Sequence, residues 1–214
     1  MNIRKIKSRG TLFTFDEPGW GLNIYLIQGK NYNYLIDTGL GSLCTDPIKE
    51  YLKEKKTIVI NTHYHWDHIW GNGAFQEETI IAHKLCYDMI QDNWDEMLCK
   101  KGNYQMGEVY KRLPDLLFDN ELYFKEDHIR LFYTPGHTID SISVLDEEDK
   151  VLLASDNIGD DEEDILPNIY NKEIYLNTIQ KYKGLDFDFC LSGHNTVLRK
   201  DVFDKISELC GTLS

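Results

Sequence analysis

The sequence predicts an α+β fold in which two β-sheets are covered by helices. Segments rich in β-branched and aromatic residues dominate the first sixty residues, and helical segments alternate with strand-like segments further along. Strands precede helices in both halves, an order typical of two sheets with helices on their outer faces. With 214 residues the chain is long enough for one substantial core and short for two. We therefore expect a single domain over residues 1–214.

The predicted elements of the first sixty residues are mainly strands. Residues 23–28 and 32–36 are β-rich, and the Gly-Lys-Asn tripeptide between them predicts a hairpin. Residues 46–55 form a predicted short helix with Pro47 at its first position, where the missing N–H of proline is not needed. Residues 57–60 have the continuous apolar character of a buried strand.

Helices and strands alternate from residue 83 onward. Residues 83–118 carry apolar side chains at helical spacing, and we expect them to form a helical insertion. Residues 173–182 place Tyr175, Ile179 and Tyr182 on one helical face. The remaining predicted elements are strands at 129–133, 141–145, 151–154 and 187–191, and a last helix at 201–210 that ends at Gly211.

Charge and cysteine content exclude several classes of protein. The net charge of −13 disfavours a nucleic-acid partner, because an acidic surface repels phosphate. A small basic cluster from Arg4 to Arg9 is expected to be a solvated chain end. The five cysteines form no C-x-x-C pair, which favours reduced thiols over a disulfide framework. Neither a signal region nor a long apolar run is visible, so we expect a cytoplasmic protein that does not span a membrane.

A cluster of potential metal ligands follows the predicted strand at 57–60. His63, His65, Asp67 and His68 lie within the stretch Thr-His-Tyr-His-Trp-Asp-His. Residues two apart in an extended segment point the same way, so His63 and His65 can converge on one ion. If the chain turns, the adjacent Asp67 and His68 can serve a second ion. Imidazole and carboxylate groups suit zinc, and also iron or manganese.

Three later residues each follow a predicted strand and extend this cluster. His137 lies in a Pro-Gly-His-Thr turn, Asp156 follows an apolar strand in Ala-Ser-Asp, and His194 lies in Ser-Gly-His. Loops at the ends of strands commonly build functional sites. Together with the first cluster these residues make seven potential ligands, which is enough for two ions.

The order of these motifs resembles the metallo-β-lactamase superfamily. T-H-x-H-x-D-H comes first, then P-G-H-T, then an aspartate after an apolar strand, then S-G-H. The resemblance extends from the I-D-T-G at residues 36–39 to Asn195, nearly the whole chain. It implies an αββα sandwich, in which two mixed β-sheets pack face to face with helices outside.

The resemblance also implies how seven ligands divide between two divalent metal ions, for which Zn²⁺ is expected before iron or manganese. His63, His65 and His137 would hold the first ion. Asp67, His68 and His194 would hold the second ion, and Asp156 would bridge the two. Asp37 would orient the ligands through hydrogen bonds.

Two departures from the family pattern affect the pocket wall. Ser155 precedes Asp156 where members often carry glycine, and Asn157-Ile158 replaces an aromatic residue that often follows. Neither change removes a ligand. The acidic run at 160–164 comes next, and it is either a solvated loop or a gate that repels anionic substrates.

Two metal ions about 3.5–4 Å apart can share a hydroxide that attacks a carbonyl carbon or a phosphorus. Asp67 would be the catalytic carboxylate that orients the nucleophile and takes a proton after attack. This chemistry predicts a hydrolase with a small-molecule substrate. The missing export signal disfavours β-lactams and the acidic charge disfavours RNA, which leaves a small ester, lactone or thioester.

Three alternatives stay open at this point. A phosphodiesterase would use the same two-ion chemistry. Persulfide dioxygenases in the superfamily that this chain resembles keep a similar motif around a single iron. A non-catalytic metal-bound module would show lost ligands, whereas all seven are present here.

The segment 83–118 is expected to cover the site and select the substrate. It lies between His68 and His137, two ligands that must converge, so both of its ends are tied close to the metals. The alternative is an ordinary surface helix packed on a sheet. The segment is rich in adaptable side chains that suit apolar ligands, namely Met89, Trp94, Met97, Tyr104, Met106 and Tyr110.

Overall fold

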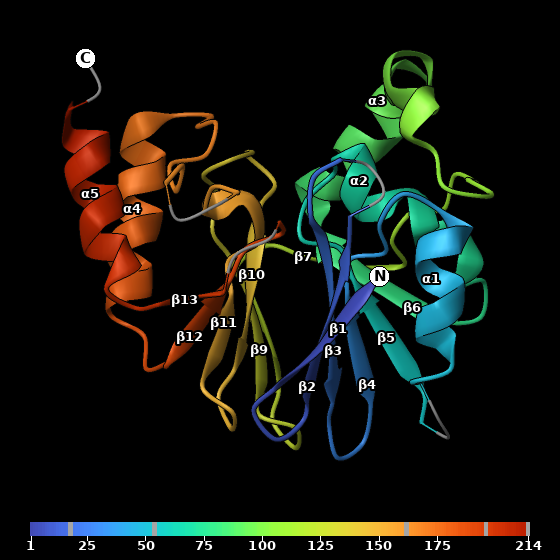
Figure 1. Ribbon diagram of the computed structural model, residues 1–214, viewed down its shortest axis with the longest axis horizontal. Helices are drawn as coiled ribbons and strands as arrows, with labels where there is room; N and C mark the ends of the chain where they lie inside the picture. The colour runs from blue at the N-terminus through green and yellow to red at the C-terminus, as the bar shows by residue number, and fades with distance from the viewer. Residues whose placement is uncertain (17–18, 53–54, 161–162, 195–196, 213–214) are drawn as a thin grey trace.

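Two mixed β-sheets pack face to face, and helices cover their outer faces (Figure 1). The computed structural model describes residues 1–16, 19–52, 55–160, 163–194 and 197–212. The predicted αββα sandwich is therefore confirmed. No helix within the described ranges is long and apolar enough to cross a membrane.

The first sheet joins an antiparallel half to a parallel half. Neighbouring strands from the first to the fourth pair antiparallel, and neighbouring strands from the fourth to the seventh pair parallel. Parallel strands bring their carboxyl ends to one edge of the sheet, which collects the loops that follow them. In spatial order the strands are β1 (Asn2–Ile6), β2 (Gly10–Phe15), β3 (Leu22–Gln28), β4 (Asn33–Ile36), β5 (Thr57–Ile60), β6 (Thr79–His83) and β7 (Leu116–Phe118).

The second sheet is antiparallel except for one parallel pair, β11 with β12. In spatial order its strands are β13 (Val197–Arg199), β12 (Phe189–Leu191), β11 (Val151–Leu153), β10 (Ile142–Asp146), β9 (Ile129–Tyr133) and β8 (Glu121–Phe124).

Helices α1 (Ser42–Lys49), α2 (Trp66–Ile69) and α3 (Lys84–Lys101) lie beside the first sheet, and α4 (Lys172–Lys183) and α5 (Val202–Thr212) beside the second (Figure 1). Short 3₁₀ turns occur at η1 (Trp70–Ala74), η2 (Gly102–Tyr104) and η3 (Ser155–Asn157).

Three apolar layers hold these elements together, one between the sheets and one under each group of helices. Strand β3 shows how the sequence divides between layers. Ile24 and Leu26 pack toward the helices, whereas Tyr25 and Ile27 pack toward the other sheet. Successive side chains of a strand point to opposite faces, so a strand buried on both faces is apolar throughout.

Several predicted elements are confirmed with small shifts at their ends. Strands β5 and β9 have the predicted bounds, and β3 and β4 form the predicted hairpin. Helix α4 buries Tyr175, Ile179 and Tyr182, as the spacing predicted. Its first turn is capped by the Asn171 side chain, which accepts a hydrogen bond from Ile174 N.

Three helix predictions were wrong in their limits. The helix predicted at 46–55 spans Ser42–Lys49 with Pro47 inside it, because Cys44 and Ile48 bury one face against the core; residues 53 and 54 lie outside the described residues. The helix predicted at 83–118 ends at Lys101, and the chain then runs irregularly to β7. Gly211 lies inside α5 and does not end it.

A buried ion pair joins the two sheets at the end opposite the loops that carry the predicted metal ligands. Arg9, expected to be solvated, is only 8% exposed. Its guanidinium donates to both carboxylate oxygens of Asp146, at the end of β10, and to the carbonyl oxygen of Asp127. Asp146 is fully buried. The basic cluster therefore contains a structural residue whose partner lies far along the chain.

Candidate metal centre

Four loops at one end of the sandwich carry the seven predicted ligands. The loop after β5, which runs into α2, carries the first four, and the loops after β9, β11 and β12 each carry one. The two halves of the set therefore come from different sheets. The structure brings all seven side chains together, namely His63, His65, Asp67, His68, His137, Asp156 and His194.

Three histidines and one aspartate form the first group. Donor atoms of His63, His65, His137 and Asp156 all lie within 4.8 Å of one another. His65 Nδ1 is 3.0 Å from His63 Nε2 and 3.1 Å from His137 Nε2. Three imidazole nitrogens at such spacing, with a carboxylate beside them, fit the donor set of a divalent transition metal.

The second group is Asp67, His68 and His194, whose donor atoms also lie within 4.8 Å of one another. Asp67 Oδ2 is 3.8 Å from His68 Nε2 and 3.7 Å from His194 Nε2. His68 is fully buried, and its Nε2 forms no hydrogen bond with any described residue. A buried nitrogen that faces two carboxylates without such a bond is a further sign that the site suits a cation.

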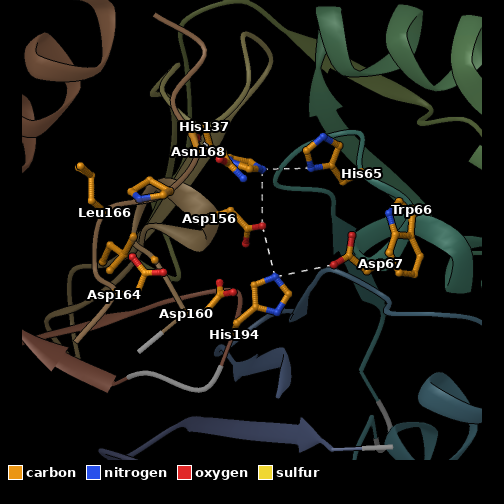
Figure 2. A pocket seen from close by; sticks show the side chains of 13 residues that line it. His65, Trp66, Asp67, His137, Asp156, Asp160, Asp164, Leu166, Asn168 and His194 are labelled. Carbon is orange, nitrogen blue, oxygen red and sulfur yellow. Dashed lines mark hydrogen bonds and ion pairs between the residues drawn. The ribbon is translucent and has the colours of Figure 1, made fainter. Parts of the chain in front are cut away.

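Asp156 lies between the two groups. Its Oδ2 is 3.7 Å from His63 Nε2 and 3.8 Å from His137 Nε2 on one side. On the other side it is 3.4 Å from His68 Nε2 and 3.3 Å from His194 Nε2. Figure 2 shows the resulting series of contacts from His65 through Asp156 to Asp67.

In His137 and His194, one ring nitrogen, Nδ1, is hydrogen-bonded to a backbone carbonyl oxygen. The other, Nε2, faces the remaining candidate ligands. His137 Nδ1 contacts the Asn168 carbonyl oxygen and His194 Nδ1 contacts the Gly21 carbonyl oxygen, each at 2.9 Å. A carbonyl oxygen only accepts, so both Nδ1 atoms must donate, and in the neutral form of each ring the lone pair then lies on Nε2. Neutral histidine ligands in metal sites are fixed in the same way, and the residues present therefore fit two divalent ions.

Local backbone geometry explains how the loops turn into the site. His65 is extended and begins α2, which turns the chain so that Asp67 and His68 face inward. Asp37 and Ser155 have positive φ angles of 63° and 49°, an uncommon conformation for residues other than glycine. Gly193 leaves no room for a side chain, because an added Cβ would lie 2.1 Å from Asp156 Oδ1.

Asp37 supports the site as the family resemblance implied. Its carboxylate accepts hydrogen bonds from Thr62 N, Thr62 Oγ1 and His68 Nδ1, each at 2.8 Å. Asn157 is a support that the sequence argument missed. Its Oδ1 accepts a hydrogen bond from His137 N at 2.8 Å, and its Nδ2 donates to Thr134 O and the Tyr182 hydroxyl. The only signal in the sequence was its replacement of an aromatic residue.

Burial and the carboxylates act in opposite directions on the histidines. Burial lowers the pKa of His63 well below its usual value and lowers the pKa of His65 to about 4. Burial also opposes protonation of His68 and His194, but Asp156 and nearby carboxylates outweigh it, raising the pKa of His68 and raising the pKa of His194 to about 9. Burial acts to raise the pKa of Asp156, but His68 and His194 outweigh burial and hold this pKa well below its usual value. Because metals bind neutral imidazole, an ion would displace their protons.

A cavity of about 330 Å³ opens onto the site. Trp66 lines it on one side, and the β11–α4 loop forms the other side, where Figure 2 shows Asp160 and Asp164. Gly159 N donates to Ile165 O at 2.8 Å, which closes the base of this acidic loop. The acidic run therefore borders the site at both of its ends; Asp161 and Glu162 lie outside the described residues.

Residues 83–118 do not line this cavity. Helix α3 instead borders a smaller neighbouring cavity, which it shares with His65 and Trp66. Trp94 is buried in the core, and Tyr104 stacks on Trp66 at a centroid distance of 5.3 Å. Large side chains of this segment thus pack under and beside the site.

Comparisons with known proteins agree with this geometry. A sequence model of the metallo-β-lactamase superfamily matches residues 18–194. The beta-lactamase-like protein 2 homolog of Caenorhabditis elegans is 26% identical over 221 residues, which cover 96% of this chain and 68% of that protein. An N-acyl homoserine lactonase of Bacillus cereus is 31% identical over 143 residues, or 62% of this chain and 52% of the lactonase. The chain thus spans about half the length of that lactonase.

Solved structures with low sequence identity share the fold. The crystal structure of the DIM-1 metallo-beta-lactamase has a TM-score of 0.80 at 18% identity, covering 100% of this chain and 98% of that chain. An archaeal metallo-beta-lactamase superfamily protein from Sulfolobus tokodaii has a TM-score of 0.67 at 18% identity, covering 88% of this chain and 79% of that chain.

Proposed function

We propose that this chain, which belongs to the metallo-β-lactamase superfamily and is a metal-dependent hydrolase, acts at a dinuclear zinc site. Its proposed substrates are small neutral esters, lactones or thioesters. The observation that carries this proposal is the convergence of seven ligand side chains around one bridging carboxylate. Five imidazoles and two carboxylates suit zinc better than calcium or magnesium. We also propose that residues 1–214 form one domain, since a single apolar layer contains side chains from both sheets.

When bound, two divalent ions supply an activated water and polarise the substrate carbonyl. In this proposal His63, His65 and His137 hold one ion, and Asp67, His68 and His194 hold the other, with Asp156 between them. Asp67 also lines the cavity, so its carboxylate can orient the attacking water and accept a proton at the oxygen that does not hold the ion.

The cavity wall supports a neutral substrate. Asp160 and Asp164 line it, and no lysine or arginine does so among the described residues. An anionic group that lies against this wall would therefore meet carboxylates and find no lysine or arginine to pair with. This arrangement disfavours substrates that carry an anionic group beside the reacting bond and favours neutral esters and lactones. The similarity to an N-acyl homoserine lactonase supports the same substrate class.

Removing the two wall charges is expected to relax this selectivity. In the double variant Asp160→Asn/Asp164→Asn, the ratio of kcat/KM for an ester with a carboxylate group to that for a matched neutral ester should rise about 10-fold or more, since each charge at a distance of about 8 Å contributes about 1 kcal/mol. The gain should shrink as salt is raised, because the interaction is screened. Steady-state kinetics at two salt concentrations measure both effects.

Glu173→Gln is the matched control, because Glu173 is an exposed carboxylate on α4 that does not line the cavity. It should leave the ratio unchanged. An unchanged ratio in the double variant as well, with normal metal content, would show that the acidic wall does not select substrates.

The proposed function is tested by metal analysis followed by a substrate panel. Protein reconstituted with excess zinc and then desalted should contain two zinc ions per chain. It should hydrolyse neutral aryl esters, lactones or thioesters much faster than bis(p-nitrophenyl) phosphate. Asp156→Ala protein, purified in parallel, corrects for contaminating hydrolases. A stoichiometry that never exceeds one ion, with iron bound and oxygen consumed in the presence of a persulfide, would instead support the dioxygenase alternative.

A further inference from the structure

The hydroxyl group of Thr62 meets three polar neighbours beneath the metal centre. Thr62 is 1% exposed, so no bulk water competes for these contacts. Its Oγ1 lies 2.8 Å from Asp37 Oδ2, 3.1 Å from His63 Nδ1 and 2.9 Å from Ser155 Oγ. All three neighbours are connected to the candidate ligands: His63 is itself one, Asp37 accepts a hydrogen bond from His68, and Ser155 precedes Asp156 in sequence.

Counting protons assigns a direction to each of the three contacts. A hydroxyl group donates one hydrogen bond and accepts two. The carboxylate of Asp37 only accepts, so the Thr62 proton must point to Asp37 Oδ2. His63 Nδ1 and Ser155 Oγ must then both donate to Thr62 Oγ1. All three positions on the hydroxyl oxygen are then filled, and the competing use of the Ser155 proton, donation to Asp156 Oδ1, spans a longer distance of 3.4 Å.

This direction decides which ring nitrogen of His63 can bind a metal. With Nδ1 protonated, Nε2 carries the lone pair, and Nε2 is the atom that lies 3.0 Å from His65 Nδ1 in the ligand cluster. With the opposite tautomer, the Nε2 proton would point into the cluster. Asp37 accepts a hydrogen bond from His68 Nδ1 and so orients the ring of His68, a candidate ligand of the second ion. One hydrogen-bond network therefore aligns a candidate ligand of each ion.

Ser155 reaches Thr62 through an unusual backbone conformation. Its φ of 49° is more typical of glycine, and it carries the side chain toward the Thr62 hydroxyl. Ser155 Oγ also lies 3.4 Å from Asp156 Oδ1, but the contact with Thr62 is the shorter of the two. A serine in place of glycine at this position supplies the second donor that Thr62 needs.

We propose that Thr62 is a positioning residue that sets the tautomer of His63 for metal binding, and that Ser155 supports it as a hydrogen-bond donor. The inference rests on the ligand assignment of the proposed function but not on the proposed substrate. Thr62, Ser155 and Asp37 together would keep the single proton of neutral His63 on Nδ1. Nε2, which faces the ion site, would then be unprotonated without any change in net charge.

The test reads the tautomer directly and in the absence of metal. Histidine ¹⁵N NMR of the metal-free protein should show His63 protonated at Nδ1. In Thr62→Val, which keeps the shape and removes the hydroxyl, a population protonated at Nε2 should appear. Zinc affinity, measured by competition with a chromophoric chelator, should fall about 10- to 100-fold. Thr62→Ser keeps the hydroxyl and should retain the tautomer and most of the affinity.

Two Ser155 variants separate the hydroxyl from the backbone. Ser155→Ala and Ser155→Gly both remove the donor, and both should weaken zinc binding by about 3- to 10-fold. Only Ser155→Gly also relieves the positive φ, so a glycine variant with wild-type affinity would show that the hydroxyl is unimportant. These variants also serve if Thr62→Val does not fold. The proposal is overturned if His63 keeps its Nδ1 proton and zinc affinity is unchanged in both Thr62→Val and Ser155→Ala. Loss of hydrolysis with normal tautomer and affinity would count against the proposed substrate instead.

Discussion

Asp156→Ala is expected to lose more than about 100-fold in affinity for the second metal ion and to lose hydrolytic activity with it. Changes to groups that only support ligands typically cost about 10- to 100-fold, and Asp156 lies directly between the two sets of ligands. Its Oδ2 is within 3.3 to 3.8 Å of Nε2 atoms in both groups. Without it, the site would lose the one candidate carboxylate that lies close to imidazoles of both ligand groups. Zinc titration of the purified variant, followed by activity measurement, gives both values.

Folding stability provides the contrast for Asp156→Ala. Thermal unfolding of the metal-free variant should change far less than metal affinity, because Asp156 lies at a loop end and the three apolar layers remain intact. Asp186→Ala removes an exposed carboxylate from the same half of the molecule, where it pairs with Lys150, and should affect neither property. Wild-type zinc affinity in Asp156→Ala would mean that this residue does not bridge the ions.

Arg9→Met should lower the free energy of unfolding by about 3–5 kcal/mol, the range expected when one partner of a buried ion pair is removed. Asp146 would then be buried without its cation, and the carbonyl oxygen of Asp127 would lose a donor. Urea unfolding of the metal-free proteins at neutral pH measures the difference. The metal site lies at the other end of the sandwich, so zinc stoichiometry should be unchanged.

Two further variants test the cause of that loss. Arg4→Met replaces an exposed arginine on β1 and should change the unfolding free energy by no more than about 0.5 kcal/mol. Arg9→Met/Asp146→Leu removes both buried charges and should recover part of the stability, because the orphaned carboxylate is gone. If Arg9→Met were no less stable than Arg4→Met, the ion pair would contribute nothing to joining the sheets.

The convergence of the seven candidate ligands was open to prediction because its information is local. Each ligand follows a strand whose apolar run is visible in the sequence, and the spacing of His63, His65 and His68 alone indicates a metal site. The αββα arrangement came from the family resemblance, supported by the alternation of strands and helices. Helix α4 was equally accessible, because its buried face repeats at regular helical spacing.

The errors arose where a distant contact decides the structure. Pro47 suggested a helix start, but packing of Cys44 and Ile48 against the core extends α1 backward to Ser42. The short strand β7 reads as a continuing apolar face, and only its pairing with β6 makes it a strand. Arg9 resembles any exposed basic residue until Asp146 is brought to it by the docking of the two sheets. The sequence left the acidic run at 160–164 open between a solvated loop and a gate for the same reason, since its place in the cavity wall depends on how the β11–α4 loop closes.

The division of the site between the two sheets also has a consequence for the order of folding. Four of the seven side chains lie within one short segment after β5, whereas His137, Asp156 and His194 come from much later parts of the chain. Loop closure makes such distant contacts slow to form, so the complete site can exist only after the sheets have docked. Refolding followed by zinc uptake would therefore time the docking of the two halves, and the local His63–His68 segment would be the first place on the nascent chain able to attract an ion.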